Sequence, residues 1–236
     1  MTKYVSVLAV LLMVGVTQAA YVTLVSEDWE SGTDGWVNYG ASDPHPALDN
    51  TQNTTPGGQW SLRTADNAST NYTNAIDWNF SEETDKSWYV EWSMMDTGST
   101  REYLQLQSYA GSTLQQLIAF GTYNGTGGGS NYFARIAVGG SNWTLTDIPR
   151  VNNVWHTFRI EQDGATGQLT FSVDGDEWTT SSTAVFGVTK MRLGSGLTNA
   201  GHGAFFDDVV FAAVPDPATL ALLGMGGLMF VRRRRA

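Results

Sequence analysis

The chain has 236 residues, no cysteine and a formal net charge of −10 at pH 7. Five of its 13 basic residues, Lys3 and Arg232–Arg235, lie in the two end segments, so residues 20–213 carry eight basic against 22 acidic residues, a net charge of −14. This charge excludes nucleic acid as a natural partner, because its phosphates would be repelled. The lack of cysteine excludes disulfides, thiol catalysis and thiolate metal sites.

The first 19 residues predict a secretory signal peptide. Lys3 gives a basic start, Val5–Val16 an apolar segment, and Thr17–Ala19 the small residues before cleavage after Ala19. The alternative is an N-terminal membrane anchor, but the apolar segment is short for a bilayer span of about 20 residues. We therefore expect export, and we exclude residues 1–19 from the fold.

Residues 20–213 predict one all-β domain. Gly, Asn, Ser and Thr are plentiful, and apolar residues alternate with period two. The expected strands are Trp88–Met94, Tyr103–Tyr109, Leu114–Phe120, Tyr132–Val138, Trp155–Glu161, Gln168–Asp174 and Phe205–Phe211, with a hairpin turn across residues 163–167. Ser42–Gly58 is expected to be irregular, Gly121–Asn131 a loop, and Asp174–Glu177 a solvated turn. Several evenly spaced strands with paired termini predict a jelly-roll β-sandwich, with Trp88, Trp92 and Trp155 in its core.

Four polar side chains share one face of the expected strand Tyr103–Tyr109. Leu104 and Leu106 point to the core, so Tyr103, Gln105, Gln107 and Tyr109 point outward, and Trp143 lies near a loop. Sugar rings pack their C–H faces on aromatic rings, while amides bond their hydroxyl groups. These residues predict a glycan-binding platform; the alternative is that the aromatic rings only cover the core.

Carboxylates gather near the first and the last expected strand. Glu27, Asp28 and Glu30 lie near the first strand, and Asp207 and Asp208 lie on the last. First and last strands of sandwiches often pair, so these oxygens could converge on Ca²⁺, which takes six to eight oxygen ligands. Alternation directs Asp207 and Asp208 to opposite faces, so at most one, assigned as Asp208, enters the site. The alternative is a hydrogen-bonding role at the sandwich edge.

Catalytic patterns are not evident. A retaining glycosidase needs two carboxylates about 5–5.5 Å apart, and the acids at Glu27, Asp28 and Glu30 do not have the alternate spacing that one strand would require. His156 lies within an expected strand and is interpreted as a packed or edge residue. No Ser-His-Asp motif occurs. The sequence therefore predicts a protein that is not an enzyme.

The last 23 residues, 214–236, have three parts. They are a proline-bracketed acidic tetrapeptide, Val214, Pro215, Asp216 and Pro217; an uncharged segment, Ala218–Val231; and four arginines, Arg232, Arg233, Arg234 and Arg235. Proline keeps the tetrapeptide extended. The 14-residue segment is short for a bilayer span, and the arginines can snorkel and stay on the cytoplasmic side. An ordinary C-terminal anchor is the alternative.

This three-part tail resembles the PEP-CTERM sorting signal of Gram-negative bacteria, with Asp216 where that family usually has Glu. The resemblance implies recognition at Pro215, Asp216 and Pro217 by an exosortase, a membrane cysteine protease. It also implies a transient anchor in the inner membrane, cleavage, and delivery to the cell surface or extracellular matrix.

Four further segments, Glu27–Trp36, Val154–Asp163, Gly167–Gly175 and Ala204–Phe211, resemble a concanavalin A-like, laminin-G-type jelly roll. That superfamily includes sugar binders, glycan-cleaving enzymes and spacer domains, and related binders commonly hold a structural Ca²⁺. We therefore expect a non-catalytic structural or glycan-binding module with extracellular polysaccharide as a partner. The alternative is a polysaccharide-active enzyme, a glycoside hydrolase or lyase, on the same fold.

Overall fold

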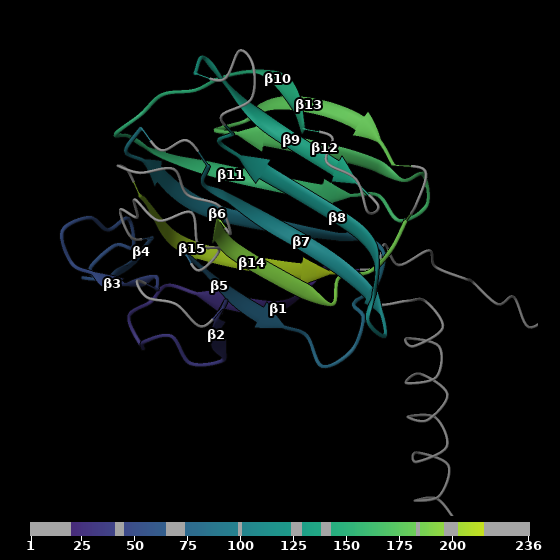
Figure 1. The fold of residues 1–236 in the computed structure, drawn as a ribbon, viewed down its shortest axis with the longest axis horizontal. Helices are drawn as coiled ribbons and strands as arrows, with labels where there is room; N and C mark the ends of the chain where they lie inside the picture. Colours follow the sequence, from purple (N-terminus) through teal and green to yellow (C-terminus); the bar gives the residue numbers. More distant parts are fainter. Residues whose placement is uncertain are drawn as a thin grey trace, which may run out of the picture.

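The computed structural model describes residues 20–40, 45–64, 74–98, 101–123, 129–137, 143–182, 185–195 and 203–214. These residues form fifteen strands in two antiparallel sheets (Figure 1). The predicted signal peptide and the sorting segment from Pro215 onward lie outside the described residues. Within the described ranges, no helix is long and apolar enough to cross a membrane.

Sheet A has the strand order β13-β12-β11-β6-β15-β4-β3, and β1 also pairs with β15. Its strands are β1 (Val22–Glu27), β3 (Ala47–Asp49), β4 (Ser61–Arg63), β6 (Trp88–Asp96), β11 (Trp155–Gln162), β12 (Gln168–Val173), β13 (Asp176–Ser181) and β15 (Ala204–Ala213). The antiparallel pairing of β1 with β15 confirms that the first and last strands lie side by side.

Sheet B has the order β10-β9-β8-β7-β14-β5-β2 and lies in front of sheet A in Figure 1. Its strands are β2 (Trp36–Asn38), β5 (Asn74–Asn79), β7 (Tyr103–Ala110), β8 (Thr113–Gly121), β9 (Asn131–Ala137), β10 (Trp143–Pro149) and β14 (Lys190–Ser195). The chain changes sheet between β5 and β6 and again between β6 and β7. This arrangement confirms the predicted all-β jelly-roll sandwich.

The hydrophobic core lies between the two sheets and follows the period-two pattern of the strands. Trp88 and Trp92 on β6 are buried, as predicted. The Trp92 ring stacks on Phe158 of β11, with ring centroids 5.3 Å apart and an interplanar angle of 18°. Trp92 and Phe158 are direct partners in the ladder of β6 and β11. Full burial of one large apolar side chain contributes roughly 1.5–3 kcal/mol.

Three sequence predictions are wrong in detail. Trp155 is only partly buried, because alternation along β11 directs it away from Phe158 to the outer face of sheet A, where it contacts Phe205. The stretch Ser42–Gly58 contains the short strand β3. Asp176 begins strand β13, so the turn is limited to Asp174 and Gly175. Short polar edge strands carry too few apolar residues to show the alternation that reveals central strands.

Candidate functional site

The outer face of sheet B carries most of the residues predicted to bind glycan. Leu104 and Leu106 of β7 belong to the core, and Gln105 and Gln107 point to the opposite face. Register extends this face across the sheet, because Gln105 pairs with Arg192 of β14 on one side and with Ala119 of β8 on the other. We define the sheet B face as Tyr39, Asp77, Arg101, Tyr103, Gln105, Gln107, Tyr109, Tyr123, Arg135, Trp143, Lys190 and Arg192.

The centre of the sheet B face is shielded. Tyr103, Gln105 and Gln107 are 7%, 6% and 5% exposed, whereas Tyr109 is partly exposed. The prediction that all four residues point away from the core is confirmed, and the centre of the predicted platform has little exposed surface. The Gln107 side-chain oxygen is buried and has no hydrogen-bond partner. An unmatched buried amide oxygen costs about 1–3 kcal/mol.

Aromatic rings flank the two glutamines on the β9–β10 side of the sheet B face. Trp143 begins β10, and its ring centroid lies 5.1 Å from that of Tyr103. Tyr123 stacks on Trp143 at 4.5 Å with an interplanar angle of 14°. The Arg135 guanidinium lies 5.8 Å from the centre of the Trp143 ring. The structure therefore brings together Tyr103 and Trp143, which are far apart in sequence.

Ionic side chains flank the glutamines on the opposite side. Arg192 donates to Asp77 through Nε and a terminal nitrogen at 2.6 and 2.9 Å, and Lys190 lies 3.2 Å from the same carboxylate. Burial lowers the pKa of Arg192, but the hydrogen bonds and charge of Asp77 outweigh it and raise that pKa above its usual value. The Arg192 guanidinium also covers the Tyr39 ring at 3.4 Å.

Sequence analysis missed this ionic group. The signal was available in the alternation of Lys190 and Arg192 with Met191 and Leu193, which is the same period-two pattern that revealed the central strands. The pairing of β14 between β5 and β7, which brings these side chains beside Asp77 and Gln105, could not be inferred from a single sequence.

Two of the predicted metal ligands, Glu27 and Glu30, order the backbone that follows β1 and the backbone that precedes β4. The Glu27 carboxylate accepts hydrogen bonds from the Trp29 backbone N–H at 2.9 Å and from the Trp36 indole at 3.2 Å. Glu30 accepts from the backbone N–H groups of Gln59 and Trp60 at 2.7 and 2.9 Å. These contacts fit the hydrogen-bonding role that the sequence left open as the alternative to a metal site.

The acidic pair on β15 departs from the expected alternation. Asp208 has a φ of 48°, and the register with β6 shifts between Asp207 and Val210. This bulge turns both carboxylates toward one loop, where the hydroxyl groups of Thr54 and Thr55 each lie within hydrogen-bond distance of both carboxylates. Burial raises the pKa of Asp207. The prediction that the two acids point to opposite faces is therefore wrong.

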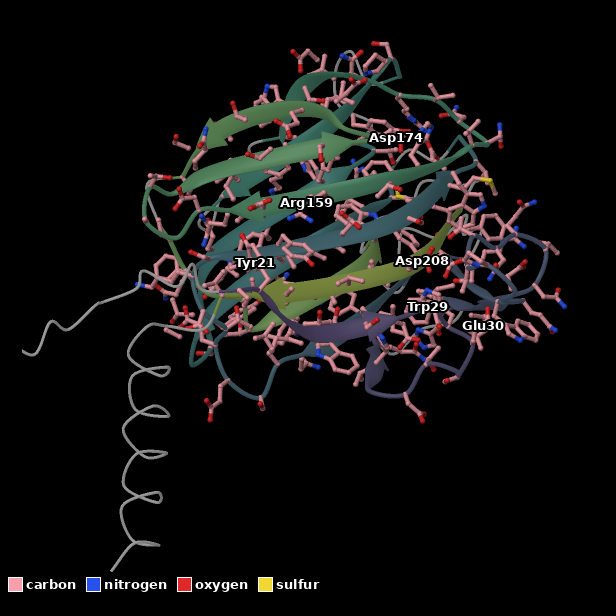
Figure 2. All side chains as sticks on the ribbon, turned by 180° about the vertical axis from the view of Figure 1, so that it is seen from behind. Tyr21, Trp29, Glu30, Arg159, Asp174 and Asp208 are labelled. Carbon is pink, nitrogen blue, oxygen red and sulfur yellow. The ribbon has the colours of Figure 1, made fainter. Side chains whose placement is uncertain are left out.

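The predicted calcium ligands lie at one end of the sandwich, but they do not form a cluster that could coordinate a metal ion. Figure 2 shows Trp29, Glu30 and Asp208 at this end. The Asp28 carboxylate accepts the Glu30 backbone N–H at 3.2 Å. Among the described residues, no three His, Asp or Glu side chains are grouped so that they could hold a metal ion.

His156 has two hydrogen-bonding partners on the sheet A side. Its Nδ1 lies 2.6 Å from the Asp174 carboxylate, and its Nε2 lies 3.2 Å from the backbone oxygen of Val151. The ring also packs against the edge of Tyr132. These contacts agree with the expected packed or edge histidine.

Comparison with known structures places this fold in a defined class. No protein-family model matches the sequence, and no curated protein is significantly similar to it. Among solved structures, the chain is similar to a cellulose induced protein, Cip1, with a TM-score of 0.56, 16% identity, and coverage of 79% of this chain and 96% of that one. It is also similar to a Crh5 transglycosylase in complex with NAG, with a TM-score of 0.53, 15% identity, and coverage of 82% and 84%.

A third similar structure is lectin II from Ulex europaeus, with a TM-score of 0.50, 11% identity, and coverage of 80% of this chain and 98% of that one. These likenesses, all at low identity, establish the fold. The chain has the concanavalin A-like jelly-roll fold that lectins and glycan-active enzymes share.

Proposed function

We propose that this chain is an exported, non-catalytic protein whose sandwich domain binds glycan on the sheet B face. The observation that carries the proposal is the row of Gln105 and Gln107 between the Tyr103–Trp143 ring pair and the Arg192–Asp77 ion pair. Amides and charged groups bond sugar hydroxyls, and aromatic rings pack on sugar C–H faces. The fold is compatible with this role because its structural neighbours include a lectin and a transglycosylase.

The composition of the sheet B face favours binding over hydrolysis. Its centre holds the uncharged amides of Gln105 and Gln107, whereas a glycosidase needs a pair of carboxylates. Asp77, the carboxylate beside them, is engaged by Arg192 and Lys190.

Affinity electrophoresis of the full chain in gels containing different glycans tests this function. Trp143→Ala and Gln107→Leu should each weaken the retarding interaction about tenfold, which corresponds to about 1.4 kcal/mol. Trp155→Ala is the matched control, because Trp155 lies on the outer face of sheet A. Absence of retardation in every glycan would refute binding. Reducing ends or unsaturated sugars released by the wild type, and lost on a single substitution, would refute the non-catalytic assignment.

For trafficking, we propose that residues 1–19 direct export and that the segment from Val214 is a PEP-CTERM signal cut by an exosortase. Val214 lies at the border of the sandwich, and its backbone N–H donates to Ser87 at 2.8 Å. The sequence order of an acidic Pro-Asp-Pro peptide, an apolar segment and four arginines supports the proposal. Replacing Asp216 by Ala should cause uncleaved protein to accumulate in the inner membrane; unchanged surface delivery would contradict it.

A further inference from the structure

We infer that the glycan held by the sheet B face is acidic and carries carboxylate groups, as uronic acid polymers do. This inference rests on the proposed function and names the ligand class of the same site. It follows from the distribution of charge between the two sheets, which differs sharply from the charge of the chain as a whole.

The basic residues are concentrated on one sheet. Strands of sheet A carry two, Arg63 and Arg159, together with nine acidic residues. Strands of sheet B carry three basic residues, Arg135, Lys190 and Arg192, and two acidic ones, Asp77 and Asp147. Alternation directs all three basic residues to the sheet B face, and Arg101 adds a fourth next to Tyr123.

This local charge can act despite the negative charge of the whole domain. At physiological ionic strength the Debye length is about 8 Å, and the sheets of a sandwich lie about 10 Å apart. The acidic residues on the outer face of sheet A lie farther from a ligand on sheet B than the cations of the sheet B face do, and the path between them through solvent around the domain is longer than the Debye length, so the nearby cations dominate. Low exposure of Arg192 and its neighbours strengthens local electrostatics, because shielded charges are screened less by salt.

The positions of the cations suit a chain-like ligand. Arg192 lies on β14 and Arg135 on β9, with β7 and β8 between them. Three strand spacings correspond to a distance of about 14 Å between the two positions. Gln105 and Ala119 lie between them in the same row. Guanidinium groups match carboxylates in a planar, two-bond geometry. Carboxylates on non-adjacent units of one oligosaccharide could therefore meet one cation each, while the intervening sugar faces the Tyr103–Trp143 pair.

Binding of the full chain to polygalacturonate and to the same polymer after carboxyl reduction tests the inference. The two probes share a backbone and differ in charge. We expect the acidic polymer to bind at least tenfold more tightly, with an affinity that falls as salt rises. Arg135→Gln should remove this preference. Arg159→Gln should retain it, and it is a matched control because Arg159 covers the Tyr89 ring at 3.7 Å and pairs with Glu91 and Glu161 on the outer face of sheet A (Figure 2).

The possible outcomes separate this inference from the proposed function. If the reduced polymer or neutral laminarin binds as tightly as polygalacturonate, glycan binding stands and the acidic ligand is refuted. If dextran sulfate binds as tightly as polygalacturonate, the site responds to charge in general and the carboxylate assignment is refuted. If no glycan binds, both proposals fail. Loss of the preference in Arg159→Gln would also overturn the assignment to the sheet B face.

Discussion

Replacing Asp77 by Asn should lower the stability of the protein while strengthening its binding of an acidic glycan. Asn keeps the shape of the side chain and one acceptor oxygen but removes the charge that holds Arg192 and Lys190. The Asp77 and Arg192 side chains are 7% and 10% exposed, so the guanidinium would remain shielded from water without its counter-ion.

Loss of one partner of a buried ion pair typically costs about 3–5 kcal/mol. Asn can still accept one hydrogen bond from Arg192, so we expect the lower end, about 3 kcal/mol. For a domain of this size, 1 kcal/mol shifts the melting temperature by about 2–4 °C, so Asp77→Asn should melt about 6–12 °C below the wild type. The released guanidinium should at the same time bind polygalacturonate roughly threefold to tenfold more tightly.

Tryptophan fluorescence during thermal and urea unfolding measures the stability change, and the affinity gels described above measure binding. Asp174→Asn is the control, because the Asp174 side chain that pairs with His156 is 53% exposed, so a loss of less than about 1 kcal/mol is expected. A melting temperature for Asp77→Asn within about 2 °C of the wild type would show that the pair is well hydrated. Weaker polygalacturonate binding by a folded Asp77→Asn protein would contradict the acidic-ligand model.

Further measurements address other parts of the molecule. Burial raises the pKa of Tyr132 from 10.0 to about 12, so the stability that neutral Tyr132 contributes below pH 10 should be lost as the pH rises towards 12, by roughly 3 kcal/mol at most. Tyr132→Phe should flatten that decline in pH-dependent unfolding. Trp92→Ala should destabilise the fold by about 3–5 kcal/mol in urea unfolding, and Trp155→Ala by clearly less, because only Trp92 is fully buried. If calcium binds near the bulge, a Ca²⁺ concentration 100 times the Kd should stabilise the protein by about 2.7 kcal/mol, and Asp208→Ala should abolish the shift in melting temperature. Truncation before Val214 should change the location or the amount of protein at the cell surface in fractionation experiments.

The sequence predicted the central strands because their two faces have different environments. Along β6, buried residues alternate with more exposed ones, so the core face could be identified from the sequence; the buried residues are Trp88, Val90, Trp92 and Met94. The predicted strand Trp88–Met94 lies within the observed Trp88–Asp96. Short edge strands such as β3 have no such contrast, since three residues that are all partly exposed or exposed give no period.

The candidate site could be predicted only in part. The face of a sheet to which a side chain points follows from local alternation, whereas the strand that lies beside it depends on the whole fold. Alternation identified the outward direction of Gln105 and Gln107, but only the ladder β5-β14-β7-β8-β9 brings Asp77, Arg192 and Arg135 beside them. The error at Asp208 has a different origin. A residue with positive φ in a bulge interrupts the alternation, and an Asp within a strand sequence gives little sign of it.

The charge difference between the sheets has a consequence for orientation. On sheet A, Arg159 is held between Glu91 and Glu161, so its charge is locally cancelled. On sheet B, the Asp77 carboxylate faces both Lys190 and Arg192, and the basic residues Arg135, Lys190 and Arg192 outnumber the two strand acids Asp77 and Asp147, so positive charge remains. An acidic polymer would therefore be repelled by one face and attracted by the other. If the sheet B face binds such a polymer, electrostatic attraction selects the docking direction before any hydrogen bond forms, and sheet A is left facing away from the polymer.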